Sequence, residues 1–106
     1  GTCTECVLVF PDGVGVVPWM PAGTNAIAQA TAEKLHDCHI VIWGQHGIFG
    51  TGKNLNEAFG LIETVEKAAE IYMKTAHLTK INHLPKEQLK DVANVYHVTP
   101  RKGYLD

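Results

Sequence analysis

Residues 39–52 have the sequence HIVIWGQHGIFGTG, and this stretch decides the class of fold. Residues 39–43 are mostly apolar and β-branched, which predicts a buried strand. Four glycines lie within the nine residues that follow, 44–52, so the backbone there bends sharply or is approached closely by another group. Side chains at the end of a buried strand often project into a crevice, so a functional site is expected here.

Two more strands are predicted upstream of this stretch. Residues 6–10 (CVLVF) form a short apolar run, and the Pro-Asp-Gly sequence that follows favours a turn, so we expect a buried strand that ends there. Residues 14–17 are expected to return as a second short strand, which ends because Pro18 and Pro21 remove donors from a strand ladder.

Three helices complete the pattern. Thr24 is a candidate N-cap for a helix that runs to about residue 36. Asn54 and Glu57 have the spacing of a capping box, and they open a long helix whose apolar residues recur at helical spacing as far as residue 76. Pro85 fits the first turn of a last helix, and residues 101–106 are expected to be loosely held. The alternation of strands and helices predicts an α/β fold, with a layered central sheet flanked by helices.

Composition excludes several classes of protein. The 106 residues hold nine basic and eleven acidic side chains, a net charge of −2, so a nucleic-acid partner or an anionic membrane surface is not expected. No apolar run approaches the ~20 residues that span a bilayer, and the start does not resemble a signal peptide. Three cysteines cannot all pair internally, which favours a reducing cytoplasm. The chain enters an apolar stretch within a few residues of Gly1, so we expect a fragment of a longer protein.

Two motifs suggest chemistry that their surroundings do not support. Residues 47–53 match the phosphate-binding pattern G-x-x-x-x-G-K, but Asn54 stands where a hydroxyl residue would be needed for magnesium, so nucleotide hydrolysis is disfavoured. Cys3 and Cys6 form a C-x-x-C. A zinc site would need two more ligands, and a redox pair favours a helix start, whereas a strand is predicted here. Buried or partly buried thiols without a function are the expected interpretation.

His46 and Glu5 are the candidate site residues. None of the six histidines lies in an H-x-H or H-E-x-x-H motif, and His46 differs from the others only because it follows a buried strand between glycines. It is either a hydrogen-bonded turn residue or a functional imidazole. Glu5 is either a solvated residue at a strand edge or an acid held at an interface for function. Trp19 and Trp43 are expected to pack in a core or an interface.

Four segments together resemble a known family: ECVLVFPDGVG at 5–15, PWMPAGT at 18–24, WGQHGIFG at 43–50 and EAFGLIET at 57–64. In this order and spacing they are similar to the class II aldolase/adducin family, and within it to the aldolases of L-rhamnulose 1-phosphate. The resemblance covers residues 3 to about 100. It implies that residues 1–106 are the C-terminal part of one such domain, whose upstream part is missing from this chain.

The resemblance also implies an activity. The aldolases of L-rhamnulose 1-phosphate have a central sheet with helices on both faces and form fourfold homotetramers. With Zn²⁺ these aldolases cleave the sugar phosphate L-rhamnulose 1-phosphate to dihydroxyacetone phosphate and L-lactaldehyde. His46 matches one of three histidines that hold the metal, and Glu5 matches a catalytic glutamate that reaches the neighbouring subunit's active site. The other two histidines, the phosphate-binding residues and the principal acid/base have no counterpart here.

Three functions stay open on this resemblance. The first is the zinc-dependent aldolase, with an isolated chain that binds zinc weakly and is inactive. The second is a sister activity on the same fold, such as a fuculose-phosphate aldolase or a pentulose-phosphate epimerase, because a fold does not fix the substrate. The third is a non-catalytic, adducin-like scaffold, against which the presence of His46 argues.

Overall fold

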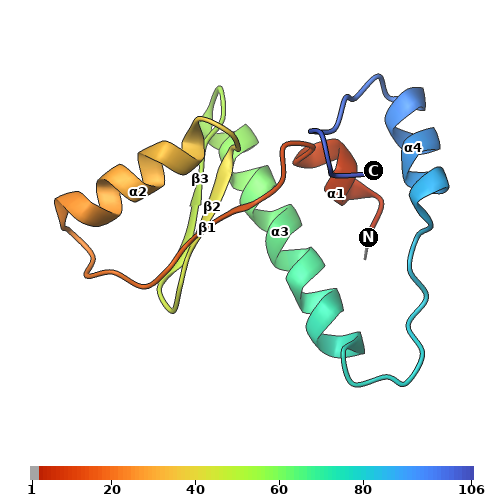
Figure 1. Cartoon of the computed structure of the whole chain (residues 1–106), viewed down its shortest axis with the longest axis horizontal. Helices are drawn as coiled ribbons and strands as arrows, with labels where there is room; N and C mark the ends of the chain where they lie inside the picture. Colours follow the sequence, from red (N-terminus) through yellow and green to blue (C-terminus); the bar gives the residue numbers. More distant parts are fainter. Residues whose placement is uncertain (1–2) are drawn as a thin grey trace. The chain divides into compact units, whose positions relative to one another are not determined.

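The computed structural model describes residues 3–106, which divide into two compact units. Unit 2 is Asp12–Ile62. Unit 1 combines the segment up to Pro11 with Glu63–Asp106. The long helix α3, Leu55–Thr75, begins in unit 2 and continues in unit 1 (Figure 1). None of the helices formed by the described residues is long and apolar enough to cross a membrane.

Unit 2 is built on a sheet of three strands in the order β1-β2-β3, and the fold is α/β. These strands are β1 (Gly15–Val17), β2 (Ile40–Trp43) and β3 (Gly47–Gly50). β1 runs parallel to β2, and the helix α2 between them supplies the crossover that parallel strands need. β3 pairs antiparallel with β2 through a tight turn. The strands predicted over 14–17 and 39–43 are confirmed, whereas β3 was not predicted.

Helix α2, Asn25–Leu35, packs on one face of the sheet (Figure 1). It begins where Thr24 predicts, because the Thr24 hydroxyl accepts a hydrogen bond from the Ile27 amide at 3.4 Å. Its buried side meets the sheet in a small core of Val17, Ile27, Cys38 and Val41. This core fixes the positions of the β2 strand and of the turn that follows it.

The start of α3 packs closely against β3 at Gly50. The Asn54 side chain accepts a hydrogen bond from the Glu57 amide at 2.9 Å, which confirms the predicted cap. A Cβ atom at Gly50 would lie 2.8 Å from Cγ1 of Ile62, so only glycine permits this close approach of strand and helix. The predicted apolar face of α3 is buried at Leu61 and Val65 but exposed at Tyr72 and Met73 (72% exposed).

In unit 1, the prediction of a strand over residues 6–10 is wrong. Glu5–Val9 forms a short helix, α1, in which Val7 is only 1% exposed. Val7 belongs to a core with Leu89, Ala93 and Leu105. A five-residue apolar run has no periodicity that separates strand from helix, so the tertiary contact decides between them.

The last helix and the C-terminal tail complete this core. Helix α4, Lys86–Val95, begins after Pro85 and buries Leu89 and Ala93, as predicted. The expectation of a loosely held tail is wrong, because Leu105 is 7% exposed within the core. The Arg101 amide also donates a hydrogen bond to the Pro11 carbonyl at 3.0 Å, which fastens the tail to the N-terminal segment.

Candidate functional site

The turn between β2 and β3 carries the predicted site residue His46. The His46 amide donates a hydrogen bond to the Trp43 carbonyl at 3.1 Å, which closes a β-turn with Gly44 and Gln45 at its centre. Gln45 has a φ of 57°, in the left-handed region that non-glycine residues seldom occupy. Such backbone strain is found most often at functional positions, where the surrounding structure maintains it.

The strand β1 holds this turn from the side. The Gly44 amide donates a hydrogen bond to the Val17 carbonyl at 2.9 Å. A Cβ atom at residue 44 would lie 3.1 Å from the Trp19 amide nitrogen, so glycine allows the two backbones to approach without crowding. Gly44 therefore helps to fix the position of the turn that carries His46.

The His46 side chain is exposed, and its ring lies against Trp43. The two ring centroids are 5.3 Å apart and the planes are tilted by 56°. Within residues 3–106, no side-chain hydrogen bond or ion pair engages the imidazole nitrogens. His46 is therefore a hydrogen-bonded turn residue through its backbone amide, whereas its side chain is available for a ligand.

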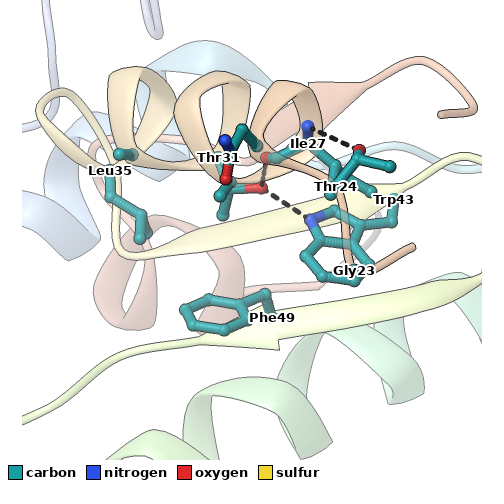
Figure 2. Close-up of a pocket in the computed structure, with 10 residues that line it drawn as sticks. Gly23, Thr24, Ile27, Thr31, Leu35, Trp43 and Phe49 are labelled. Atoms are coloured by element: carbon teal, nitrogen blue, oxygen red, sulfur yellow. Dashed lines mark hydrogen bonds between the residues drawn. The ribbon is translucent and has the colours of Figure 1, made fainter. Parts of the chain in front are cut away.

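A pocket of about 510 Å³ lies between α2 and the sheet (Figure 2). Its floor includes Trp43 and Phe49, whose rings stack with centroids 6.2 Å apart and planes 16° apart. The rest of its lining comes from α2 and the loop before it: Gly23, Thr24, Asn25, Ile27, Ala28, Thr31, Ala32 and Leu35. The lining is mostly apolar, as in most small-molecule pockets.

Two polar side chains of this pocket, Trp43 and Thr31, are hydrogen-bonded to each other. The Trp43 indole Nε1 donates a hydrogen bond to the Thr31 hydroxyl at 2.9 Å, and that hydroxyl donates to the Ile27 carbonyl at 2.6 Å (Figure 2). Trp43 thus connects the pocket with the turn at His46, because it lines the pocket and its ring lies against the ring of His46. The sequence analysis assigned Trp43 to packing and missed Thr31. The one signal for Thr31 in the sequence is its position on the buried side of a predicted helix.

The described residues supply one candidate metal ligand and no complete site. Residues 3–106 hold no cluster of three or more histidine, cysteine, aspartate or glutamate side chains that could bind a metal ion. His39 and Asp12 form an exposed pair, but Nε2 of His39 lies 3.8 Å from Oδ2 of Asp12, and this distance is too long for a hydrogen bond. Within this part of the chain, His46 therefore belongs to no such cluster.

Glu5 lies in a different setting from the one predicted. It is the first residue of α1 in unit 1, whereas His46 belongs to unit 2. Its carboxylate is exposed, on a helix instead of a strand edge. Trp19, expected to pack, is 63% exposed.

Comparison with known families gives a clear match. Residues 2–73 match the family model described as Class II Aldolase and Adducin N-terminal domain. The matched range includes β1 to β3, α2 and the turn with His46.

Individual relatives agree with this match. The chain is 50% identical over 105 residues to a rhamnulose-1-phosphate aldolase of Enterococcus faecalis, covering 98% of this chain and 38% of the relative. It is 53% identical over 104 residues to a rhamnulose-1-phosphate aldolase of Listeria welshimeri, covering 96% and 37%. The crystal structure of a sugar-phosphate aldolase from Thermotoga maritima superimposes with a TM-score of 0.68 at 33% identity, covering 74% of this chain and 34% of that one. The chain thus spans less than two fifths of the length of the curated relatives it matches.

Proposed function

Because the chain belongs to the class II aldolase and adducin family, we propose that it is part of a zinc-dependent aldolase that cleaves L-rhamnulose 1-phosphate to dihydroxyacetone phosphate and L-lactaldehyde. The observation that carries the proposal is the identity of 50% over 98% of this chain to a relative with that name. Identity at this level extends through the turn and the helices around it, and not only through a short motif.

The proposal assigns to residues 1–106 the C-terminal part of one class II aldolase domain. The resemblance of the quoted segments supports this, and so does the coverage of 38% of the Enterococcus relative. The single available ligand also supports it, because a catalytic zinc site needs three protein ligands and one open position. In this proposal the remaining ligands and the phosphate-binding residues lie on the part of the domain that this chain does not include.

His46 is proposed as one of the metal ligands. Its unpaired imidazole, at the tip of a turn whose backbone is held by Gly44 and β1, supports that role. A divalent cation bound there would supply Lewis-acid chemistry, since it would stabilise the negative charge on oxygen that carbon–carbon cleavage produces. His46 would hold the metal through an imidazole nitrogen, and the ring of Trp43 lies against that imidazole.

Glu5 is proposed as a catalytic carboxylate that acts in the neighbouring subunit of a homotetramer. Its exposure at the start of α1 leaves it free to reach another chain, where it would accept or return a proton during cleavage. The same proposal places the enzyme in the cytoplasm, with a sugar phosphate as its substrate.

A chimera tests the proposed activity. The matching segment of the Enterococcus relative is replaced by this chain, and release of dihydroxyacetone phosphate from L-rhamnulose 1-phosphate is measured before and after a chelator. We expect activity that the chelator abolishes and Zn²⁺ restores. His46→Ala is expected to lower kcat/KM by at least about a hundredfold, since losing even a residue that only supports a metal ligand costs about 10- to 100-fold. His36→Ala, which removes an exposed imidazole at the end of α2, is the matched control and should retain activity.

The other outcomes separate the alternatives. A folded, metal-loaded chimera that cleaves only fuculose phosphate or epimerises a pentulose phosphate would contradict the proposed substrate. A folded chimera that binds no metal would favour the non-catalytic scaffold. Full activity in the His46→Ala chimera would contradict the role of His46.

A further inference from the structure

The thiols of Cys3 and Cys6 lie in direct contact in unit 1. Their Sγ atoms are 2.9 Å apart, and both side chains are partly buried and free of disulfides. In the predicted strand, residues three apart would point to opposite faces, but at the start of α1 this spacing brings both side chains to one side. The structure thus removes the reason for which the sequence analysis set aside a redox pair.

We propose that Cys3 and Cys6 are a site of reversible oxidation that closes to an intramolecular disulfide by exchange with a low-molecular-weight disulfide such as oxidised glutathione. This site is distinct from the turn at His46 and does not depend on the proposed aldolase activity. Nothing in the chemistry of aldol cleavage requires two thiols at the start of α1.

The exchange proceeds in two balanced steps. The Cys3 thiolate attacks one sulfur of the small disulfide, so that a mixed disulfide forms at Cys3 and one small thiolate leaves and takes up a proton. The Cys6 thiol then loses its proton and attacks Sγ of Cys3, which releases the second small thiol. Two protein thiols are oxidised, and one small disulfide is reduced to two thiols.

The surroundings of the pair favour this order of events. Burial, and then the hydrogen bond with Cys3, raise the pKa of the Cys6 thiol to about 12, so Cys6 stays protonated at neutral pH and the first attack falls to Cys3. Once Cys3 is a mixed disulfide, it no longer carries the negative charge that helps to raise the pKa of Cys6. The first step therefore makes the second easier.

The fold keeps the two sulfurs together. Val7, next to Cys6, is anchored in the core with Leu89 and Leu105, so α1 is held at its buried side. In an unfolded chain the same two thiols would sample many separations. Folding should therefore raise the effective concentration of one thiol near the other, and with it the equilibrium constant for closing the disulfide.

The third cysteine provides an internal control. Cys38 is 6% exposed in unit 2, and its Sγ donates hydrogen bonds to the carbonyls of Lys34 at 3.2 Å and Ile40 at 3.3 Å. Burial of this kind protects a thiol from exchange. Cys38 should therefore stay reduced while Cys3 and Cys6 are oxidised.

The test equilibrates the 106-residue chain with mixtures of reduced and oxidised glutathione, both folded and in concentrated urea. Remaining thiols are then alkylated and counted by mass spectrometry. We expect the folded chain to lose two alkylatable thiols, which corresponds to a mass decrease of about 2 Da before alkylation. Its equilibrium constant for closing the disulfide should exceed that of the unfolded chain by at least about tenfold. Cys38→Ser should behave in the same way, whereas Cys3→Ser should form no internal disulfide.

Three results would overturn the proposal: equal constants for the folded and unfolded chains, a disulfide that includes Cys38, or a mixed glutathione adduct at Cys3 that persists without closing. Circular dichroism establishes whether Cys3→Ser folds. If it does not, the comparison of folded and unfolded Cys38→Ser chains decides the question alone. Because the readout is a thiol count, failure here is independent of any failure to find aldolase activity.

Discussion

At the scale of single residues, the Thr31 hydroxyl links α2 to the end of β2. It is 5% exposed, donates to the Ile27 carbonyl and accepts from the Trp43 indole. Thr31→Val should lower the free energy of unfolding by about 1–2 kcal/mol, since it removes two hydrogen bonds and leaves the indole N–H without its acceptor. Urea unfolding measures the loss, and Thr31→Ser, which keeps the hydroxyl, should lose less. Equal stability of the valine variant and the original chain would contradict this account of the pocket.

A second residue, Glu70, should make stability depend on pH. Its carboxylate accepts hydrogen bonds from Lys67 Nζ at 2.7 Å and Lys74 Nζ at 2.6 Å. These lower the pKa of Glu70 from 4.5 to about 2. Because the pKa is lower in the folded state, the stabilisation is present above pH 4.5 and is lost as the pH falls towards 2.

Thermal unfolding of Glu70→Gln measures this contribution. The difference in Tm between the variant and the original chain should be small, because the group is exposed, and should shrink over that acidic range and in high salt. Glu66→Gln removes an exposed carboxylate of the same helix that has no lysine partner among residues 3–106, and it is the matched control. A Tm difference that grows on acidification would show that the ion pairs do not stabilise the fold.

The candidate site shows how far single residues can be predicted from sequence. His46 could be singled out because its strand and its glycines are local signals. Its free imidazole and its contact with Trp43 depend on a turn that β1 holds from the side, and no local pattern encodes that contact. Thr31 was missed for the same reason, since its hydroxyl acquires a role only when α2 lies on the sheet.

At the scale of elements, α1 is the element whose type was predicted wrongly from the sequence, and two valines test it. Val7 is 1% exposed and Val9 is 37% exposed. In a strand these two residues would share a face, whereas in a helix they diverge. Val7→Ala should therefore cost about 2 kcal/mol of unfolding free energy, as expected for buried methyl groups, and Val9→Ala less than about 0.5 kcal/mol. Similar losses from the two variants, measured by urea unfolding, would support the strand instead.

The elements that were predicted correctly have local signals of their own. α2 and α3 begin at capping side chains, Thr24 and Asn54, and α4 begins after a proline. β3 lacks such a signal, because its sequence GIFG has two glycines and becomes a strand only by pairing with β2. Local chemistry thus predicts where helices start, while strand pairing and the packing of α1 depend on residues far away in sequence.

At the scale of the whole molecule, each of the two units has its own core, yet residues 3–106 hold no cluster of three potential metal ligands in either unit. Large apolar side chains remain exposed in both, among them Phe59 in unit 2 and Tyr72 in unit 1. Exposed apolar area of this kind is typical of surfaces that other protein covers. This agrees with the proposal that the rest of the domain supplies both the cover and the missing ligands.

Zinc binding tests that proposal for the whole chain. Since residues 3–106 hold no group of three potential ligands, the 106-residue chain should bind Zn²⁺ only weakly, and His46→Ala should change the titration little. In the chimera, three histidines would converge, so tight one-to-one binding that His46→Ala abolishes is expected in a competition titration with a chromophoric chelator. Cys3→Ser, used in both proteins, removes any contribution of the thiol pair. Tight one-to-one zinc in the isolated Cys3→Ser chain would mean that this chain carries a complete site, and the division of ligands proposed here would be wrong.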